Sequence, residues 1–156
     1  MAPGIVLALH VAPRRGTPVE QVAQVELRAG EGVVGDRHYR RGAARSRARA
    51  LTLVAAEDLE AVAQAGLPIE AAATRRQVLV RGVDLSTLVG RRFRLGSALA
   101  EGSGPCAPCA HLEALVGPGV ERALQGRAGI TARILEGGTV AVGDALQPLD
   151  AAPGDR

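Results

Sequence analysis

The sequence contains no lysine and no tryptophan, and it has only one phenylalanine and one tyrosine. Without lysine, no side chain of this protein can form a Schiff base with a carbonyl substrate or cofactor. All 19 basic residues are therefore arginine. With so few aromatic rings, the chain offers little surface on which nucleobases could stack. The hydrophobic core must consist mainly of valine, leucine, isoleucine and alanine.

Cysteine is also scarce, with Cys106 and Cys109 the only two in the chain. The opening stretch Met1–Val11 has no basic segment before its apolar part, so we expect no secretory signal peptide. No apolar run approaches the roughly eighteen residues that a membrane span needs. We therefore expect a cytoplasmic protein whose two thiols are reduced.

The length and the charge set broad limits. A chain of 156 residues is long enough to bury one core, so we expect a single domain over residues 1–149. Residues 150–156 are rich in alanine, proline, glycine and aspartate, which predicts a frayed tail. The formal net charge of +3 favours anionic ligands without requiring nucleic acid.

Most of the chain reads as short strands separated by glycine turns. The predicted strands are Gly4–Val11, Val22–Leu27, Ala50–Val54, Arg75–Val80, Phe93–Leu95 and Ala98–Ala100, followed by a hairpin of Ile130–Leu135 with Val140–Leu146. Helices are expected at Glu57–Ala65 and Val120–Leu124, with one turn capped by Asp84. This pattern predicts a mainly β (α+β) fold, a closed or partly closed β-barrel with a few short peripheral helices.

The segment around the two cysteines, G-S-G-P-C-A-P-C-A-H-L, carries the most chemistry. Pro108 opens an apolar run with helical spacing and is expected in the first turn of a helix. Cys109 would then lie where the helix dipole favours a thiolate, which binds soft metals or attacks sulfur. Two cysteines and three histidines without zinc-finger spacing do not predict a zinc site. The alternative is that both thiols pack in the hydrophobic core and have no chemical role.

Other candidate functional residues are charged. Asp36 and His38 form an Asp-x-His pair that could bind a metal or place a proton donor, although a turn cap with an exposed histidine is the simpler interpretation. Four arginines at the beginnings of strands or within them could bind phosphate or carboxylate through two N–H groups each. These are Arg49, Arg75, Arg76 and Arg133.

Two further hypotheses belong to other functional classes. Cys106 and Cys109 could form a dithiol redox module, although a thioredoxin-type motif belongs after the first strand and this one comes late. The polar Arg40–Ala50 stretch is expected to be a mobile loop, and Arg37–Arg49 could form an anion- or nucleic-acid-binding module. We rank nucleic acid low as a partner because the chain has a single tyrosine.

Six segments in order resemble the MOSC domain, a module found at the C-terminus of molybdenum cofactor sulfurases and in small stand-alone bacterial proteins. The resemblance covers nearly the whole chain and rests on these residues: G-V-V-G-D-R-H (Gly32–His38), A-L-T-L-V (Ala50–Val54), R-R-Q-V-L-V-R-G-V-D-L (Arg75–Leu85), L-V-G-R-R-F-R-L-G (Leu88–Gly96), C-A-P-C-A-H-L (Cys106–Leu112) and G-I-T-A-R-I-L-E-G-G-T-V-A-V-G-D (Gly129–Asp144).

The resemblance implies a β-barrel that presents one reactive cysteine, Cys109, with Cys106 as an accompanying thiol. The implied activity is sulfur transfer through a persulfide, or molybdenum-dependent reduction with Cys109 as a molybdenum ligand. It would thus be sulfurtransferase-like or a component of an oxidoreductase dependent on molybdenum cofactor (molybdopterin). The cofactor ends in phosphate, which would give Arg49, Arg75, Arg76 and Arg133 an anion to bind.

The resemblance also implies partners and contains one departure. A cysteine desulfurase or a reductase would be needed for turnover. Pyridoxal phosphate is associated with the family, but here it could only be held by such a partner, because this chain has no lysine. Many relatives have Arg-Asn where this chain has Arg76-Gln77, which weakens any transfer of a side-chain amide role to this position.

Overall fold

The structure is a computed structural model that describes residues 3–107, 113–114 and 117–149. Its elements in chain order are β1 (Gly4–Val11), β2 (Glu20–Val22), β3 (Gln24–Arg28), β4 (Gly32–Val33), β5 (Leu51–Ala55), α1 (Ala56–Gln64), η1 (Ala71–Thr74), β6 (Val78–Arg81), η2 (Leu85–Leu88), β7 (Arg92–Leu95), β8 (Ala98–Pro105), α3 (Val120–Ala123), β9 (Ile130–Glu136), β10 (Gly138–Ala141) and β11 (Ala145–Pro148).

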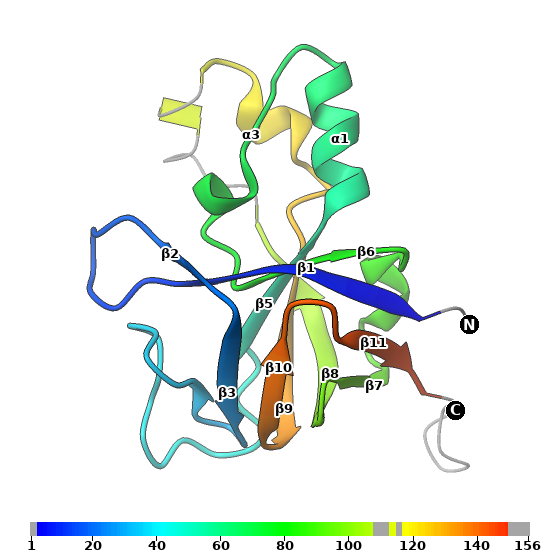
Figure 1. Ribbon diagram of the computed structural model, residues 1–156. Helices are drawn as coiled ribbons and strands as arrows, with labels where there is room; N and C mark the ends of the chain where they lie inside the picture. The colour runs from blue at the N-terminus through cyan, green and yellow to red at the C-terminus, as the bar shows by residue number, and fades with distance from the viewer. Residues whose placement is uncertain (1–2, 108–112, 115–116, 150–156) are drawn as a thin grey trace.

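Seven strands close into a barrel, which confirms the predicted architecture (Figure 1). Their order is β11-β7-β8-β9-β5-β6-β1, and β1 pairs back to β11 with Gly4 opposite Leu146. Strand β2 extends the sheet beyond β1. The interior is filled by aliphatic side chains, with the single phenylalanine, Phe93, fully buried among them. Closure leaves the barrel strands without a free edge, which satisfies their backbone hydrogen-bonding groups.

Strands β10, β3 and β4 form a separate three-stranded sheet, and this corrects one prediction. The hairpin expected between Ile130–Leu135 and Val140–Leu146 does not form. Strand β9 pairs with β5 and β8, whereas β10 pairs with β3. The returning segment is also interrupted at Gly143, whose φ of +94° turns the chain between β10 and β11. Alternating hydrophobicity identifies strands, but it does not identify their partners.

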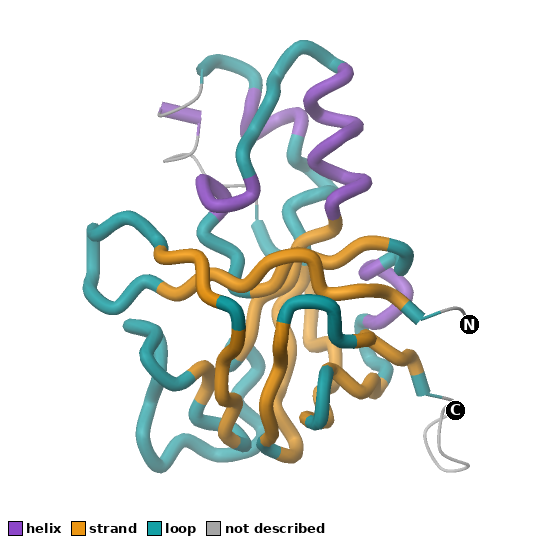
Figure 2. Tube along the Cα trace, in the orientation of Figure 1, coloured by secondary structure: helices purple, strands orange, loops and turns teal. Residues whose placement is uncertain are grey.

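Helices α1 and α3 lie together on one side of the barrel, and η2 lies apart from them (Figure 2). Strands β5 and β6 are parallel, so the chain must cross over between them, and α1 and η1 lie in that crossover. A second apolar cluster joins α1 to α3 and to the outer face of β5 through Val54, Leu59, Val62, Val120 and Leu124. This cluster explains why β5 is almost continuously buried rather than alternating.

Most predicted elements are found close to their expected bounds, with two exceptions in the functional part of the chain. Strand β6 begins at Val78, three residues later than predicted, because Arg75 adopts a left-handed conformation with φ of 59°. The helix expected to begin at Pro108, and Cys109 within it, lie outside the described residues. Among the helices that are described, none has the length and apolar character needed to cross a membrane.

Gly102 on β8 provides a test of the barrel packing. A Cβ atom at this position would overlap the carbonyl oxygen of Leu88. We expect Gly102→Ala to lower the free energy of unfolding by roughly 1–3 kcal/mol, the usual effect of forced overpacking. Gly104 is the matched control on the same strand, since a Cβ there would meet nothing within 4 Å. Urea denaturation of the two variants measures the difference, and equal stabilities would contradict the packing described here.

Candidate functional site

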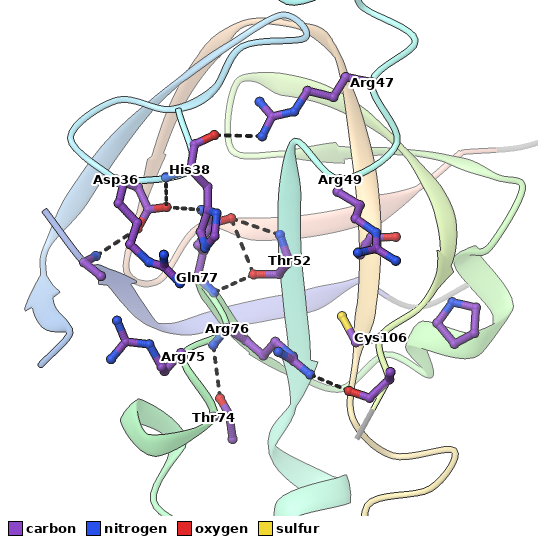
Figure 3. Close-up of a pocket in the computed structure, with 15 residues that line it drawn as sticks. Asp36, His38, Arg47, Arg49, Thr52, Thr74, Arg75, Arg76, Gln77 and Cys106 are labelled. Atoms are coloured by element: carbon purple, nitrogen blue, oxygen red, sulfur yellow. Dashed lines mark hydrogen bonds between the residues drawn. The ribbon is translucent and has the colours of Figure 1, made fainter. Parts of the chain in front are cut away.

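A pocket of about 590 Å³ opens at one end of the barrel. It is lined by Ala12, by the loop between β4 and β5, by the residues that precede β6, and by the end of β8 with Cys106 and Ala107. Figure 3 shows Asp36, His38 and Gln77 on one side of this pocket and Cys106 with Arg49 on the other. The pocket is cationic, and five arginines line it: Arg37, Arg47, Arg49, Arg75 and Arg76.

The buried carboxylate of Asp36 joins three segments around the pocket. Its Oδ1 accepts a hydrogen bond from the backbone N–H of Ala12 at 2.8 Å. Its Oδ2 accepts from the backbone N–H of His38 and from Nε2 of Gln77, both at 3.1 Å. The residue is only 7% exposed, so these donors replace the water that an ionised carboxylate would otherwise bind. Asp36 thereby fixes the backbone from which His38 projects.

Gln77 carries this network into the barrel. Its Oε1 accepts from the backbone N–H of Thr52 at 3.0 Å, and its own backbone N–H donates to Oγ1 of Thr52 at the same distance. Gln77 is only 6% exposed. Both the oxygen and the nitrogen of the side-chain amide are therefore hydrogen-bonded in the structure. Gln77 connects β5, the start of β6 and Asp36.

Arg47 organises the long loop between β4 and β5. Its two terminal nitrogens donate to the backbone carbonyls of Glu31 and His38, each at 2.7 Å. Burial lowers the pKa of this guanidinium, with a smaller contribution from Arg40. The stretch Arg40–Ala50 contains turns and no helix or strand, as predicted. Hydrogen bonds nevertheless hold it over the pocket.

Arg75 contributes a buried donor that has no acceptor. It is the only described residue other than glycine with a positive φ. Its Nη1 donates to the carbonyl of Thr17 at 2.9 Å, which connects it to the β1–β2 loop. Its Nη2 is buried and has no hydrogen-bond partner among the described residues. Because an unpaired buried charged donor is costly, this atom is suited to an anionic ligand.

None of the five pocket arginines forms an ion pair with a described carboxylate. The five ion pairs in the described part of the chain involve other arginines, namely Arg28, Arg81, Arg92, Arg94 and Arg133. The five arginines that line the pocket are thus gathered at one place without a described carboxylate to neutralise them. This gathering, rather than the arginine number, indicates a binding site for anions.

Cys106 is the described thiol of the pocket. Burial raises the pKa of this thiol, whereas the positive charges of Arg76 and Arg49 act to lower it. Figure 3 shows Arg49 on the same side of the pocket as the sulfur, and the side chain of Arg76 extending toward that side. The burial effect is the largest, so the thiol form is favoured when no ligand alters the environment.

The structure brings together six of the residues singled out from the sequence. Asp36, His38, Arg49, Arg75, Arg76 and Cys106 all line the pocket. Arg133 does not. Its Nε donates to the carbonyl of Ser46 at 3.1 Å, and its Nη1 pairs with Glu101 at 3.6 Å. Arg133 therefore supports the loop from outside the pocket, and Cys109 lies beyond the described residues.

Sequence reasoning missed three contributors to the site. Thr52 lies in the middle of β5 and Gln77 directly before β6, and their polarity within apolar runs was the available signal. Arg47 was not separated from the other arginines of its loop. Its distinctive contacts are with backbone carbonyls, which no sequence pattern specifies.

Gln77 provides a test of the buried network. We expect Gln77→Glu to lower the free energy of unfolding by about 1–3 kcal/mol at neutral pH, because it places a second carboxylate against Asp36. Gln21→Glu on the exposed strand β2 is the control. Chemical denaturation measures the effect, and equal losses in the two variants would refute the network.

His38 provides a pH-dependent test. Burial and the neighbouring charge of Arg37 lower the pKa of its imidazole, while Asp36 partly opposes them. We expect NMR titration of His38 to give a midpoint below the ordinary value of about 6.5. Removing an opposing positive charge in Arg37→Gln should raise that midpoint. His38→Gln assigns the signal, and a wild-type midpoint at or above the ordinary value would contradict the described environment.

Comparison with solved structures supports the fold. The YuaD protein from Bacillus subtilis superposes with a TM-score of 0.83 at 21% identity, covering 97% of this chain and 98% of that chain. YiiM from Escherichia coli gives a TM-score of 0.70 at 22% identity, covering 97% and 72% respectively. YiiM from Geobacillus stearothermophilus gives 0.73 at 19%, covering 97% and 78%. These similarities establish a shared architecture.

Family comparison adds the assignment. A search of curated proteins gave no significant match. The model of the MOSC domain matches residues 10–147, which include the barrel strands from the end of β1 to β11 and every pocket residue described above. This match agrees with the motif order of the sequence and with the closed barrel. The chain belongs to the MOSC domain family.

Proposed function

We propose that this protein binds molybdenum cofactor in the arginine-lined pocket and uses the cysteine segment for sulfur transfer or molybdenum-dependent reduction. The MOSC family is linked to molybdenum cofactor in general. The observation that carries the proposal is the set of five pocket arginines, none of which is ion-paired with a described carboxylate. A phosphorylated pterin is an anionic ligand that such a pocket would favour.

The residues present fit such a ligand. The buried Nη2 of Arg75 lacks an acceptor, and a phosphate oxygen would supply one. Arg49 is exposed at the pocket and is free of described ion pairs, so it would bind from the opposite side. When bound, the cofactor supplies the redox and atom-transfer chemistry of its metal. The pocket arginines would bind and orient its anionic end.

Asp36 and His38 would act at the mouth of the pocket. Asp36 is occupied by three donors, so its task is to hold the loop rather than to exchange protons. The lowered pKa of His38 leaves its imidazole neutral near pH 7. A neutral imidazole has an unprotonated ring nitrogen that can accept a proton, so His38 would act as a general base toward a substrate or a bound water.

The cysteine segment would provide the thiol. We assign to Cys109 the role of persulfide carrier or molybdenum ligand, because soft thiolates suit both. Cys106 lines the pocket wall and would accompany it. Turnover would require a protein partner, a reductase or a cysteine desulfurase, and any pyridoxal phosphate would reside on that partner.

The test is cofactor retention during purification from a host that makes molybdenum cofactor. We expect the wild-type protein to retain both pterin and molybdenum. Arg75→Gln should reduce bound pterin about tenfold or more, since a charge-assisted hydrogen bond contributes about 1.5–3 kcal/mol. Cys109→Ser should lower molybdenum more than pterin. Pterin fluorescence after oxidation and elemental analysis give the two quantities.

The matched control is Arg94→Gln, because Arg94 lies on β7 and pairs with Glu136 outside the pocket. This variant should retain pterin at the wild-type level. The proposal is wrong if the wild-type protein retains no pterin, or if the Arg75 and Arg94 variants retain it equally. A Cys109→Ser variant with unchanged molybdenum content and unchanged persulfide formation would remove the role assigned to that thiol.

A further inference from the structure

Arg76 differs from the other pocket arginines in what its guanidinium contacts. Its Nε donates to the carbonyl of Ala128 at 2.9 Å, and its Nη2 donates to the carbonyl of Ala107 at 3.1 Å. Its own carbonyl accepts a hydrogen bond from Nδ1 of the buried His10 at 3.1 Å. Both the backbone and the side chain of Arg76 are thus held, and the side chain reaches across the pocket (Figure 3).

These contacts fix the segment that contains Cys106. The backbone N–H of Cys106 donates to the carbonyl of Gly129 at 2.8 Å. Arg76 binds the carbonyls on either side of this hydrogen bond, Ala107 following Cys106 and Ala128 preceding Gly129. A Cβ atom at Gly129 would overlap the carbonyl oxygen of Leu53, so this crossing of β5 and β9 is tightly packed. Arg76 therefore ties the segment that contains Cys106 to this tightly packed crossing.

The same guanidinium acts electrostatically on the thiol. Of the charges that lower the pKa of Cys106, Arg76 makes the largest contribution and Arg49 the next. Arg76 also lines the pocket and has further N–H groups that no described residue accepts. An anion bound at those groups would neutralise part of the field that reaches the sulfur.

We propose that Arg76 is a positioning residue that couples the occupancy of the pocket to the reactivity of Cys106. It does so in two ways, by tethering the backbone of Ala107 and by placing a positive charge near the sulfur. The inference rests on the proposed function in one respect only, that the ligand of the pocket is an anion. It does not depend on the identity of that anion.

The experiment measures alkylation of Cys106 by iodoacetamide as a function of pH. Trypsin cleaves this lysine-free chain after arginine, so both cysteines fall in the peptide 95–122, and fragmentation by mass spectrometry separates the two sites. The pH midpoint of the rate reports thiol ionisation. The plateau rate at high pH reports access to the sulfur, because ionisation is then complete.

Two variants distinguish the charge effect of Arg76 from its tethering effect. Arg76→Gln removes the charge and weakens the tether, so we expect a higher midpoint and alkylation at pH 7 slower by about threefold to tenfold relative to the plateau. Arg76→Lys keeps the charge but lacks the planar fork that reaches both carbonyls. It should keep the wild-type midpoint and show a higher plateau rate.

Arg133→Gln is the matched control, because Arg133 lies outside the pocket and contacts Ser46 and Glu101. It should match the wild type in both quantities. A merely structural role for Arg76 would raise the plateau in both Arg76 variants and leave both midpoints unchanged. That result, or variants indistinguishable from Arg133→Gln, would overturn the inference.

The effect of a bound anion on Cys106 is tested by repeating the alkylation with inorganic phosphate at constant ionic strength. We expect phosphate to raise the Cys106 midpoint in the wild type and to leave it unchanged in Arg76→Gln. An equal shift in both proteins, or no shift in a wild type that binds phosphate, overturns the coupling. Its failure is distinct from that of the proposed function, which depends on pterin retention. A protein without pterin can still show the Arg76 effect, and a pterin-binding protein can lack it.

Discussion

The hydrogen bonds accepted by Asp36 are the interaction on which the pocket depends. One carboxylate holds the residue that follows β1, the loop before β5 and the residue before β6, which are far apart in the sequence. A buried carboxylate needs several donors, and here they come from three segments that the carboxylate joins at one point. Gln77 then transmits this arrangement to β5 through Thr52. The position of the His38 backbone follows from it.

The paired arginines of this protein lie away from the pocket, whereas the arginines that line the pocket have no described carboxylate partner. Arginines on the outer strands are paired with glutamates, an arrangement that adds little stability but avoids unbalanced charge. The pocket arginines repel one another without such compensation, and Arg75 adds a strained backbone and a buried unpaired donor. Such features persist when the surrounding fold imposes them. The barrel and the Asp36 network provide that rigidity, which leaves the pocket prepared for an anion.

The sequence predicted the barrel because a chain with many short alternating strands, glycine turns and few helices is compatible with few other folds. It singled out Asp36 and His38 as an Asp-x-His pair, and Arg49, Arg75 and Arg76 because these arginines stood beside the beginnings of strands. It did not predict that Arg133 would point to the loop backbone, since one charge beside a strand is like another until the partner is known. The hairpin of β9 with β10 failed for the same reason, because strand pairing is decided by long-range packing. Gln77 was undervalued because its importance lies in two specific partners, Thr52 and Asp36.

The pairing of β1 with β11 joins the first and last strands of the described chain. Gly4 and Leu146 can meet only after nearly every residue between them has been synthesised. Until then β1 has one edge without its final neighbour, and the apolar interior is open along one side. Contacts of such large sequence separation fold slowly, since the chain loses much entropy before they form. During biosynthesis, the early structure of this protein therefore consists of local elements, such as β5 with α1. The barrel closes only when β11 has been synthesised and pairs with β1.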